Sequence, residues 1–301
     1  MKLLAKDYKR IVIKIGSSLL YSQKSKLDDD FVNEIAGQIS NLIKNGKEIV
    51  VVSSGAIAMG MSVLKLESRP KELSSLQAAA AIGQHELMQV YRRFFQKRQL
   101  NCAQLLLTWE DFKERKRYLN AKNTLLTLLK LKSVPIINEN DTVSTDEIKF
   151  GDNDRLSALV ASLISADLLI ILSDVDGLLA KDKAVINIVE DITPQIRELA
   201  CPTNKKTCVG GMITKIEAAK LATEAGIPCI IANDRRKDII LSVLEEPSKH
   251  ATLFLPKVSL NAKKRWIAFS AKSKGKIIVD EGAKNALLNN KVKAQLLLDT
   301  G

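Results

Sequence analysis

The chain has 301 residues, of which 46% are hydrophobic and 27% charged, as in a globular protein with a full core. Its four cysteines form no Cys-x-x-Cys pair and it has only two histidines, which argues against a disulfide framework and a zinc site. The net charge is +12, and residues 257–301 hold ten Lys and Arg against three Asp and Glu, so most of the excess belongs to the C-terminal tail.

The N-terminal segment MKLLAKDYKR lacks the apolar stretch of a signal peptide. The longest apolar run, LISADLLIIL, is too short to span a bilayer and contains an aspartate. We therefore expect a cytoplasmic protein that does not enter a membrane.

Apolar strands alternate with helical patterns along the first 256 residues. Strands are predicted at 10–15, 48–53, 103–107, 134–138, 167–173 and 227–233. Helices are predicted at 28–45, 73–98, 117–130, from 154 onward, and at 211–226. This α/β order predicts a mainly parallel sheet with helices on both faces, a three-layer αβα sandwich. Ligands of such sheets bind beyond the carboxyl ends of the strands.

The C-terminal part has a different composition. Residues 245–265 mix Pro, Ser and Lys, and we interpret them as a linker. Beyond, KKRWIAF and GKIIVDEGAKNALLNN predict two strands and a short helix, which would form a small β-rich C-terminal appendage. We therefore divide the chain into residues 1–256 and 257–301.

Residues 137–161 are predicted to form a polar loop that runs into the start of a helix. It contains six amide and carboxylate side chains: Asn138, Asn140, Asp141, Asp152, Asn153 and Asp154. So dense a group suits a loop that holds a small zwitterion or a metal–phosphate group. Asn and Asp also favour turns and N-caps for local reasons, so this span alone leaves a solvated turn as an equal alternative.

Two lysines stand beside loops suited to a phosphate. Lys14 lies inside the first apolar strand, where an ammonium group is costly unless it reaches an anion or extends to water. Gly16 would let backbone N–H groups approach the same anion. Lys215 lies one turn into a helix preceded by Gly210 and Gly211, and a helix N-terminus favours phosphate. The chain has no GxxxxGK[ST] or GxGxxG motif, which argues against a Walker ATPase and a Rossmann dehydrogenase.

Seven segments occur in a recognisable order: KIGSSLL, VVSSGAIAMG, QAAAAIGQHELM, INENDTV, FGDNDRLSALVA, LSDVDGL and GGMITKIEAAK. In these segments the chain resembles the glutamate 5-kinases of the amino acid kinase family, over about residues 8 to 256. TLF, KKRWIAF and GKIIVDEGAKNAL are similar to the start of that family's PUA domain. The similarity stops about halfway through such a domain, so its RNA-binding associations are not carried over.

The resemblance implies ATP-dependent phosphorylation of the side-chain carboxylate of L-glutamate. The products would be L-glutamyl 5-phosphate and ADP, in the first step of proline biosynthesis. The resemblance further implies Mg²⁺ as a cofactor, with no protein side chain assigned to the metal. It also implies L-proline as a feedback inhibitor and a homodimer or homotetramer.

The resemblance also implies roles for individual residues. Lys14 and Lys215 would flank the transferring phosphoryl group, and Asp154 would orient both lysines. Glutamate would be held by Ser54, Gly55, Ala56, Asn138, Asp141, Asp152 and Asn153. The nucleotide would be bound by Lys14, Gly16, Ser17, Ser173, Asp174, Val209, Gly210, Gly211, Met212, Ile213, Thr214 and Lys215. The family usually has Gly-Thr where this chain has Cys208-Val209, and we expect that difference to affect nucleotide affinity and not the reaction.

The chemistry of the residues is consistent with this reaction. A carboxylate nucleophile is ionised at neutral pH and needs no general base, and the motif loops contain no histidine. Asp141 suits a free ammonium group, because an N-acetylated glutamate would leave it unpaired. Aspartate and N-acetylglutamate remain alternative acceptors. A UMP acceptor would need an arginine cluster, and Arg155 is the only arginine in this loop.

The basic tail suggests a second class of function. Its cations, with Trp266 and Phe269 among them, could bind a nucleic acid by charge and stacking. A solvated surface explains the same charges, and we favour it because charge runs are usually solvated faces. We therefore do not expect nucleic acid as a partner.

Overall fold

The computed structural model describes residues 8–16, 28–143, 153–200, 211–257 and 278–288. The chain divides into two units, residues 1–271 and 272–301. The domain boundary expected after residue 256 stays a prediction. In the second unit, helix α12 (Glu281–Leu288) confirms the predicted short helix, and Asp280 accepts a hydrogen bond from the backbone N–H of Ala283 at 2.7 Å. The strand predicted in KKRWIAF and most of the strand predicted in GKIIV lie outside the described residues.

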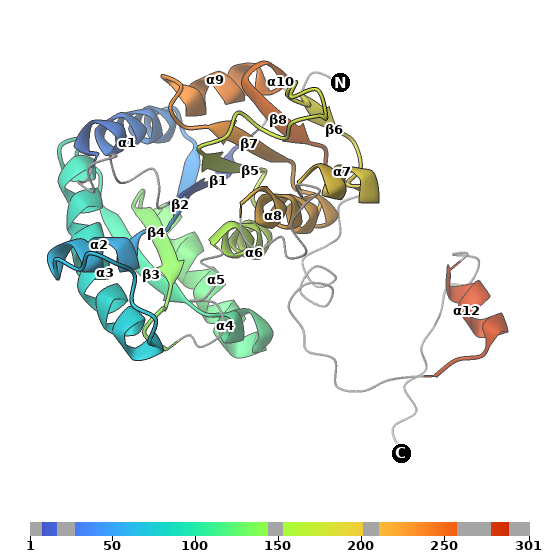
Figure 1. Cartoon of the computed structure of the whole chain (residues 1–301), viewed down its shortest axis with the longest axis horizontal. Coiled ribbons are helices and arrows are strands. Elements are labelled where there is room, and N and C mark those ends of the chain that lie inside the picture. The colour runs from blue at the N-terminus through green and yellow to red at the C-terminus, as the bar shows by residue number, and fades with distance from the viewer. Residues whose placement is uncertain (1–7, 17–27, 144–152, 201–210, 258–277, 289–301) are drawn as a thin grey trace. The chain divides into compact units, whose positions relative to one another are not determined.

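The first unit is built on an eight-stranded sheet in the order β3-β4-β2-β1-β5-β7-β8-β6 (Figure 1). The strands are β1 (Arg10–Ile15), β2 (Glu48–Ser53), β3 (Cys102–Leu107), β4 (Val134–Glu139), β5 (Leu168–Ser173), β6 (Ile188–Val189), β7 (Cys229–Asn233) and β8 (Ala251–Phe254). All neighbouring strands pair in parallel except β7 and β8, which are antiparallel. The mainly parallel sheet and its six predicted strands are confirmed.

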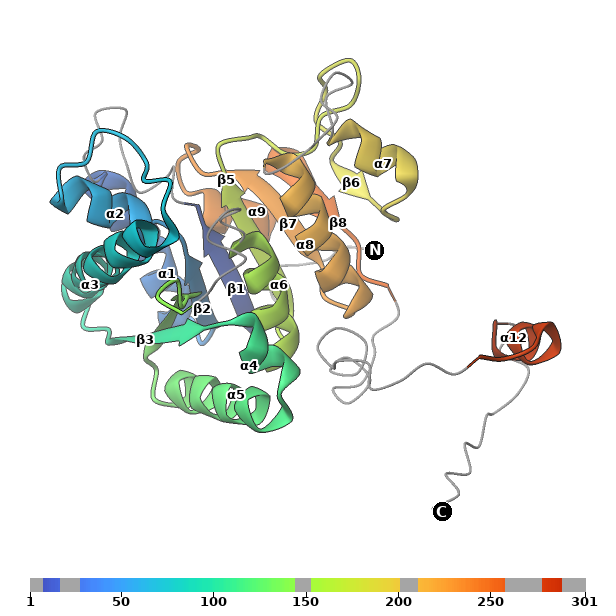
Figure 2. The ribbon, with the colours of Figure 1, turned by 60° about the horizontal axis from the view of Figure 1, so that its bottom comes forward.

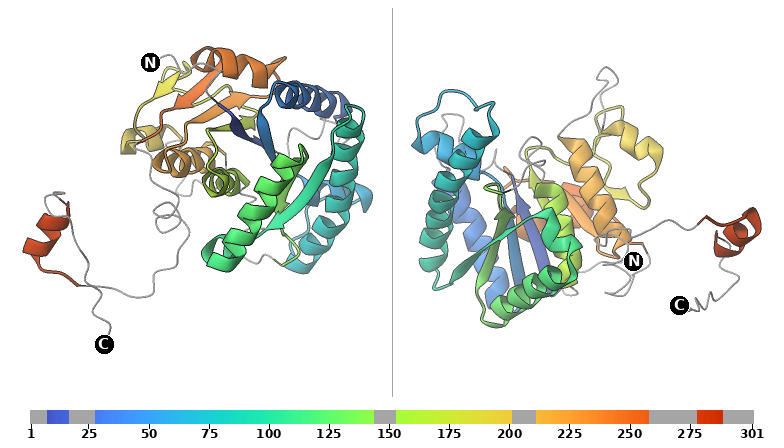
Figure 3. Two further views of the ribbon diagram at one scale, coloured as in Figure 1. Left: turned by 180° about the vertical axis from the view of Figure 1, so that it is seen from behind. Right: turned by 90° about the horizontal axis from the view of Figure 1, so that it is seen from below.

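Helices cover both faces of the sheet (Figure 2). One face packs against α1 (Asp29–Lys44), α2 (Ala56–Val63), α3 (Leu73–Gln96) and α9 (Ile239–Glu245). The other packs against α4 (Trp109–Lys113), α5 (Arg115–Lys130), α6 (Asn153–Ile164), α7 (Pro194–Leu199) and α8 (Met212–Glu224). Alternation along β1 explains the two cores, since Ile11 and Ile13 face the first layer and Val12 the second. Figure 3 shows the same layers from behind and from below.

The interpretation of residues 245–265 as a linker is wrong for their first half. Helix α10 (Pro247–His250) leads into β8, and all four residues of β8 are buried. Thr252 accepts a hydrogen bond from the backbone N–H of Leu178 at 2.8 Å, which ties β8 to the loop after β5. The run ATLF is too short to show a period, and its strand state comes from pairing with β7.

Helices α2 and α3 meet at two glycines. A Cβ atom at Gly83 would lie 1.8 Å from the carbonyl oxygen of Ala56, and one at Gly60 would lie 1.8 Å from that of Ala79. Only glycine permits such a close approach of two helices. This contact fixes the first turn of α2 beside the carboxyl end of β2.

No helix in the described part of the chain is both long and apolar enough to cross a membrane.

Candidate active site

The carboxyl ends of the parallel strands meet at one edge of the sheet. In sheet order, the residues at these ends are Asn138 near the end of β4, Ser54 after β2, Gly16 after β1, Asp174 after β5 and Asp234 after β7. The backbone N–H of Ser54 donates to the carbonyl of Ile15 at 3.1 Å, so the loops after β1 and β2 adjoin. This edge is where a ligand of a parallel α/β sheet is expected.

Two lysines far apart in sequence meet at one carboxylate. Lys14 Nζ lies 2.6 Å from Asp154 Oδ1, and Lys215 Nζ lies 3.3 Å from Asp154 Oδ2. Thr214 also donates to Asp154 Oδ2, at 2.8 Å. Lys14 is only 7% exposed, so its ammonium group does not extend to bulk water.

Helices α6 and α8 carry this cluster into the interior. Every residue of α6 except Arg155 is buried, and Asp154 stands in its first turn. Lys215 stands near the start of α8, which begins after Gly211 at a φ of 75°. Burial would raise the pKa of Asp154, but Lys14 and Lys215 outweigh it and hold that pKa below its ordinary value. One ionised carboxylate between two ammonium groups leaves a net positive charge, which attracts an anion.

An amide network lies next to the cluster. Asn153 Nδ2 donates to Ser54 Oγ at 2.8 Å and to Asn138 Oδ1 at 2.9 Å. Asn138 Oδ1 also accepts from the backbone N–H of Glu139 at 2.9 Å, and Asn138 Nδ2 donates to Gln84 Oε1 at 2.8 Å. A backbone N–H can only donate, so it fixes the orientation of the Asn138 amide and, through it, that of Asn153.

This network leaves one acceptor open. Asn153 is 7% exposed, and its Oδ1 is buried and accepts no hydrogen bond from the described residues. An unsatisfied buried acceptor is costly, and native proteins rarely keep one without a ligand or water to fill it. We infer that a bound molecule donates to Asn153.

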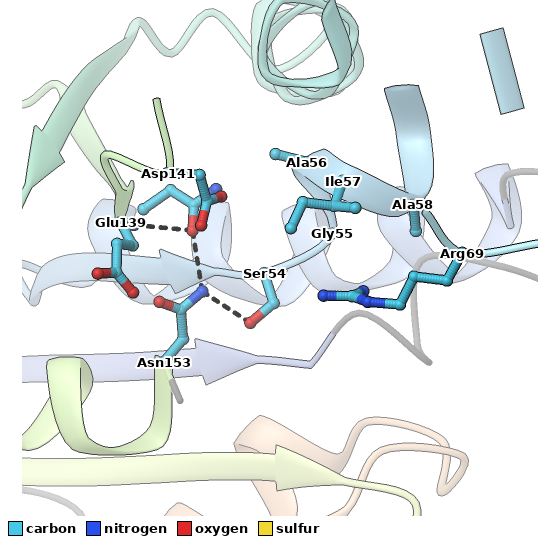
Figure 4. Close-up of a pocket in the computed structure, with 10 residues that line it drawn as sticks. Ser54, Gly55, Ala56, Ile57, Ala58, Arg69, Glu139, Asp141 and Asn153 are labelled. Carbon is cyan, nitrogen blue, oxygen red and sulfur yellow. Dashed lines mark hydrogen bonds between the residues drawn. The ribbon is translucent and has the colours of Figure 1, made fainter. Parts of the chain in front are cut away.

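A pocket of about 100 Å³ opens beside these amides (Figure 4). It is lined by Ser54, Gly55, Ala56, Ile57, Ala58, Arg69, Asn138, Glu139, Asp141 and Asn153. The first turn of α2, whose backbone N–H groups have no partner within the helix, forms one wall. Two carboxyl groups, the arginine and this helix N-terminus thus face one small space. Opposite charges so close together suit a zwitterion, and the space is far below the roughly 300–1,000 Å³ of pockets for drug-sized ligands.

Asp141 is electrostatically unusual. Burial and the neighbouring Glu139 raise the pKa of Asp141 to about 7, although Arg69 opposes the shift. Without a cation beside it, this carboxyl group therefore gains and loses its proton near neutral pH. A cation bound beside it would favour the ionised form.

The other side of the lysine cluster is formed by the ends of β5 and β7. Ser173 Oγ donates to Asp174 Oδ1 at 3.1 Å, and the backbone N–H of Asp234 donates to the carbonyl of Ser173 at 3.0 Å. Asp234 is 5% exposed; burial raises its pKa to about 6, with Arg235 lowering it and Asp174 raising it. Of these residues, the sequence reading missed Asp234. Its position directly after an apolar strand was the available signal.

The structure brings together most of the residues that the sequence predicted. Four of them lie outside the described residues: Ser17, Asp152, Val209 and Gly210. Five lining or supporting residues were missed: Ile57, Ala58, Arg69, Gln84 and Glu139. Glu139 could have been found, because it stands inside the polar motif INEND.

Comparison with known proteins adds two findings. The amino acid kinase family model matches residues 9–233. The chain is also 46% identical over 288 residues to the glutamate 5-kinase of Thermoanaerobacter sp. (strain X514), covering 93% of this chain and 77% of that protein. It is 46% identical over 293 residues to the glutamate 5-kinase of Nitrosospira multiformis (95% and 79% covered) and 43% identical over 302 residues to that of Dictyoglomus thermophilum (98% and 80% covered).

Proposed function

The chain belongs to the amino acid kinase family and, within it, to the glutamate 5-kinases, and we propose that the edge of the sheet described above is its active site. The reaction transfers the γ-phosphoryl group of ATP to the side-chain carboxylate of L-glutamate. It gives L-glutamyl 5-phosphate and ADP, the first step of proline biosynthesis. One observation supports the site most strongly: Lys14 and Lys215 converge on Asp154 beside a pocket that holds charges of both signs.

The reaction needs no general base. A glutamate side chain is ionised above a pH of about 4.3, so its oxygen can attack the γ-phosphorus while the bond to the ADP oxygen breaks. Phosphoryl transfer then depends on positioning and on neutralising charge. Lys14 and Lys215 supply that positive charge, and Asp154 holds both ammonium groups in place at 2.6 and 3.3 Å.

Glutamate occupies the pocket beside the lysines. Its ammonium group pairs with Asp141 and donates to the open Oδ1 of Asn153, while Ser54 and Asn138 hold the Asn153 amide. Ile15 is paired with Ser53 across β1 and β2, so the end of β1 lies next to Ser54. A glutamate side chain that extends past Ser54 therefore points toward the end of β1. The carboxylate of glutamate thereby approaches Lys14.

ATP lies on the other side of the cluster. We assign Gly16, Ser173, Asp174 and the segment 211–215 to the nucleotide, since the N-terminus of α8 favours phosphate. Mg²⁺ enters with the nucleotide as part of the substrate.

The acidic wall of the pocket favours glutamate over N-acetylglutamate. Acetylation removes the cation that Asp141 and Glu139 would face, and both carboxyl groups line the pocket. Aspartate retains that cation, and its shorter chain would leave the carboxylate farther from Lys14. We therefore expect glutamate to be a better acceptor than either N-acetylglutamate or aspartate. The rates of ADP release with the three acceptors test this preference, and equal rates would contradict it.

The direct test of the function is to trap the acyl phosphate. Incubation with L-glutamate, ATP, Mg²⁺ and hydroxylamine should give γ-glutamyl hydroxamate together with an equal amount of ADP. Omission of glutamate should abolish both products. ADP without hydroxamate would indicate ATP hydrolysis and contradict the proposed acceptor.

Glutamate binding should depend on pH through Asp141. Below its pKa of about 7 the carboxyl group is neutral and cannot pair with an ammonium group, whereas above it the carboxylate can. We expect kcat/KM for glutamate, which reports the free enzyme, to be about tenfold lower at pH 6 than at pH 8. In the complex the pair is already formed, so kcat should change little over this range.

The variant Asp141→Asn tests that assignment. It removes the titrating group and its charge, so kcat/KM should be low at every pH and its rise between pH 6 and pH 8 should vanish. A variant profile that keeps the rise would place the titrating group elsewhere.

Four further expectations stay predictions. L-proline also joins an ammonium group to a carboxylate, so we propose that it competes for the glutamate pocket. A homodimer or homotetramer follows from the family resemblance, and a cytoplasmic location stays an expectation from the apolar pattern of the sequence. The tail residues Trp266 and Phe269 lie outside the described part of the chain, and we keep the interpretation of the basic tail as a solvated surface.

A further inference from the structure

Arg69 reaches the glutamate pocket from a segment that the sequence reading did not assign to the site. It lies between α2 and α3, directly before Pro70, and its side chain lines the pocket together with Asp141 and Asn153. Figure 4 shows the guanidinium group pointing toward Ser54 and the start of α2. Among the described lining residues it is the only cation.

The pocket divides into an acidic and a basic side. Glu139, the last residue of β4, and Asp141, two residues further on, form the acidic side. Arg69 and the N–H groups at the first turn of α2, which have no partner within the helix, form the basic side. A free amino acid offers an ammonium group and a carboxylate on the same carbon, which matches two such sides facing each other.

We propose that Arg69 binds the α-carboxylate of the substrate and so restricts the enzyme to free amino acids. The proposal rests on the proposed function of this site. A guanidinium group binds a carboxylate through two parallel hydrogen bonds, which gives both affinity and orientation. Arg69 thereby helps to aim the other end of the substrate at Lys14.

The α-carboxylate is a better partner for Arg69 than the side-chain carboxylate. The ammonium group at Asp141 and the α-carboxylate share a carbon, and Arg69 is close enough to Asp141 to influence its ionisation. The side-chain carboxylate must leave this region to reach the lysine cluster. An arginine that held both of its oxygens would also hinder its attack on phosphorus.

The test compares glutamate with isoglutamine, which differs from it only in the carboxyl group attached to the α-carbon. Isoglutamine keeps the ammonium group and the side-chain carboxylate of glutamate but has an amide in place of the α-carboxylate. Dissociation constants for both ligands are measured by calorimetry at pH 8.5, where Asp141 is ionised, in the wild type and in Arg69→Met. We expect the variant to bind glutamate about 10- to 100-fold more weakly and isoglutamine unchanged.

The preference of the wild type for glutamate over isoglutamine should therefore disappear in Arg69→Met. In Arg69→Lys, which keeps the charge but not the paired donors, it should be intermediate. Lys71→Met is the matched control, because Lys71 is an exposed cation two residues away that does not line the pocket. That variant should keep the wild-type preference and the wild-type kcat.

Two results would overturn the proposal. Equal weakening of both ligands in Arg69→Met would show that Arg69 acts through Asp141 and not on the α-carboxylate, and an unchanged glutamate constant would remove Arg69 from the site. A wild type that makes no γ-glutamyl hydroxamate would refute the proposed function instead, so the two failures are distinct. Arg69 is exposed on a connecting segment, and melting curves of the variants should match that of the wild type.

Discussion

Replacing Lys215 by alanine should lower kcat by about 10²- to 10³-fold while the KM for glutamate changes little. The ammonium group lies 3.3 Å from Asp154 and does not line the glutamate pocket, and we propose that it acts on the transferring phosphoryl group. Loss of charge that acts mainly in the transition state lowers kcat and kcat/KM together. Steady-state kinetics with glutamate varied at saturating ATP measure both constants.

The matched control is Lys220→Ala on the same helix. Lys220 pairs with Glu224 one turn further along α8, and both side chains are partly exposed. An exposed pair of this kind contributes little to stability, so the control should keep the wild-type kcat and melting temperature. If Lys215→Ala turned over glutamate at the wild-type rate, Lys215 would have no role in the transition state.

The sheet could be predicted because its central strands carry a strong local signal. Continuous apolar runs such as those at 10–15 and 48–53 form the buried strands β1 and β2 with the predicted bounds. Helix α2 gave no such signal. It has only eight residues. Its N-cap is Gly55, with a φ of 110°, and its Gly60 packs against Ala79 of α3. The position of α2 is set by this contact with α3, and the sequence of α2 alone carries no information about that contact.

Some residues of the site could likewise be predicted from their local sequence, and others could not. Lys14 stood out because a lysine within an apolar strand needs an anion, and the structure supplies Asp154 at 2.6 Å. Arg69 did not stand out, because the segment between α2 and α3 has no periodicity and its arginine looks like any exposed cation. Only the packing of α2 against α3 brings this segment over the pocket. Residues that act through a long-range contact of this kind have no signature in their own neighbourhood.

Asp154→Asn should destabilise the folded protein by about 3 kcal/mol at neutral pH. The substitution keeps the size of the side chain but leaves Lys14 and Lys215 facing each other in a buried site without a counter-charge. Because the pKa of Asp154 is lowered on folding, its contribution is fully present above its unfolded pKa and is lost only as the pH falls through the folded value. Urea unfolding at pH 7 therefore measures the whole effect.

A matched control is Glu217→Gln on α8. Glu217 forms an ion pair with Arg197 at 2.7 Å, and both side chains are more than a third exposed. Solvent screens such a pair, so its removal should change the free energy of unfolding by less than about 1 kcal/mol. An equal loss in both variants would mean that burial of the lysine cluster has no special cost.

A phosphate-bearing ligand should restore part of the stability that Asp154→Asn loses. A ligand stabilises the folded state according to its concentration relative to its dissociation constant. In the wild type, Asp154 already satisfies both lysines, whereas in Asp154→Asn an anion relieves their repulsion. ATP should therefore raise the melting temperature of Asp154→Asn more than that of the wild type, although kcat is lower because neither lysine is held in position. A smaller rise in the variant would show that the two ammonium groups do not share one anion.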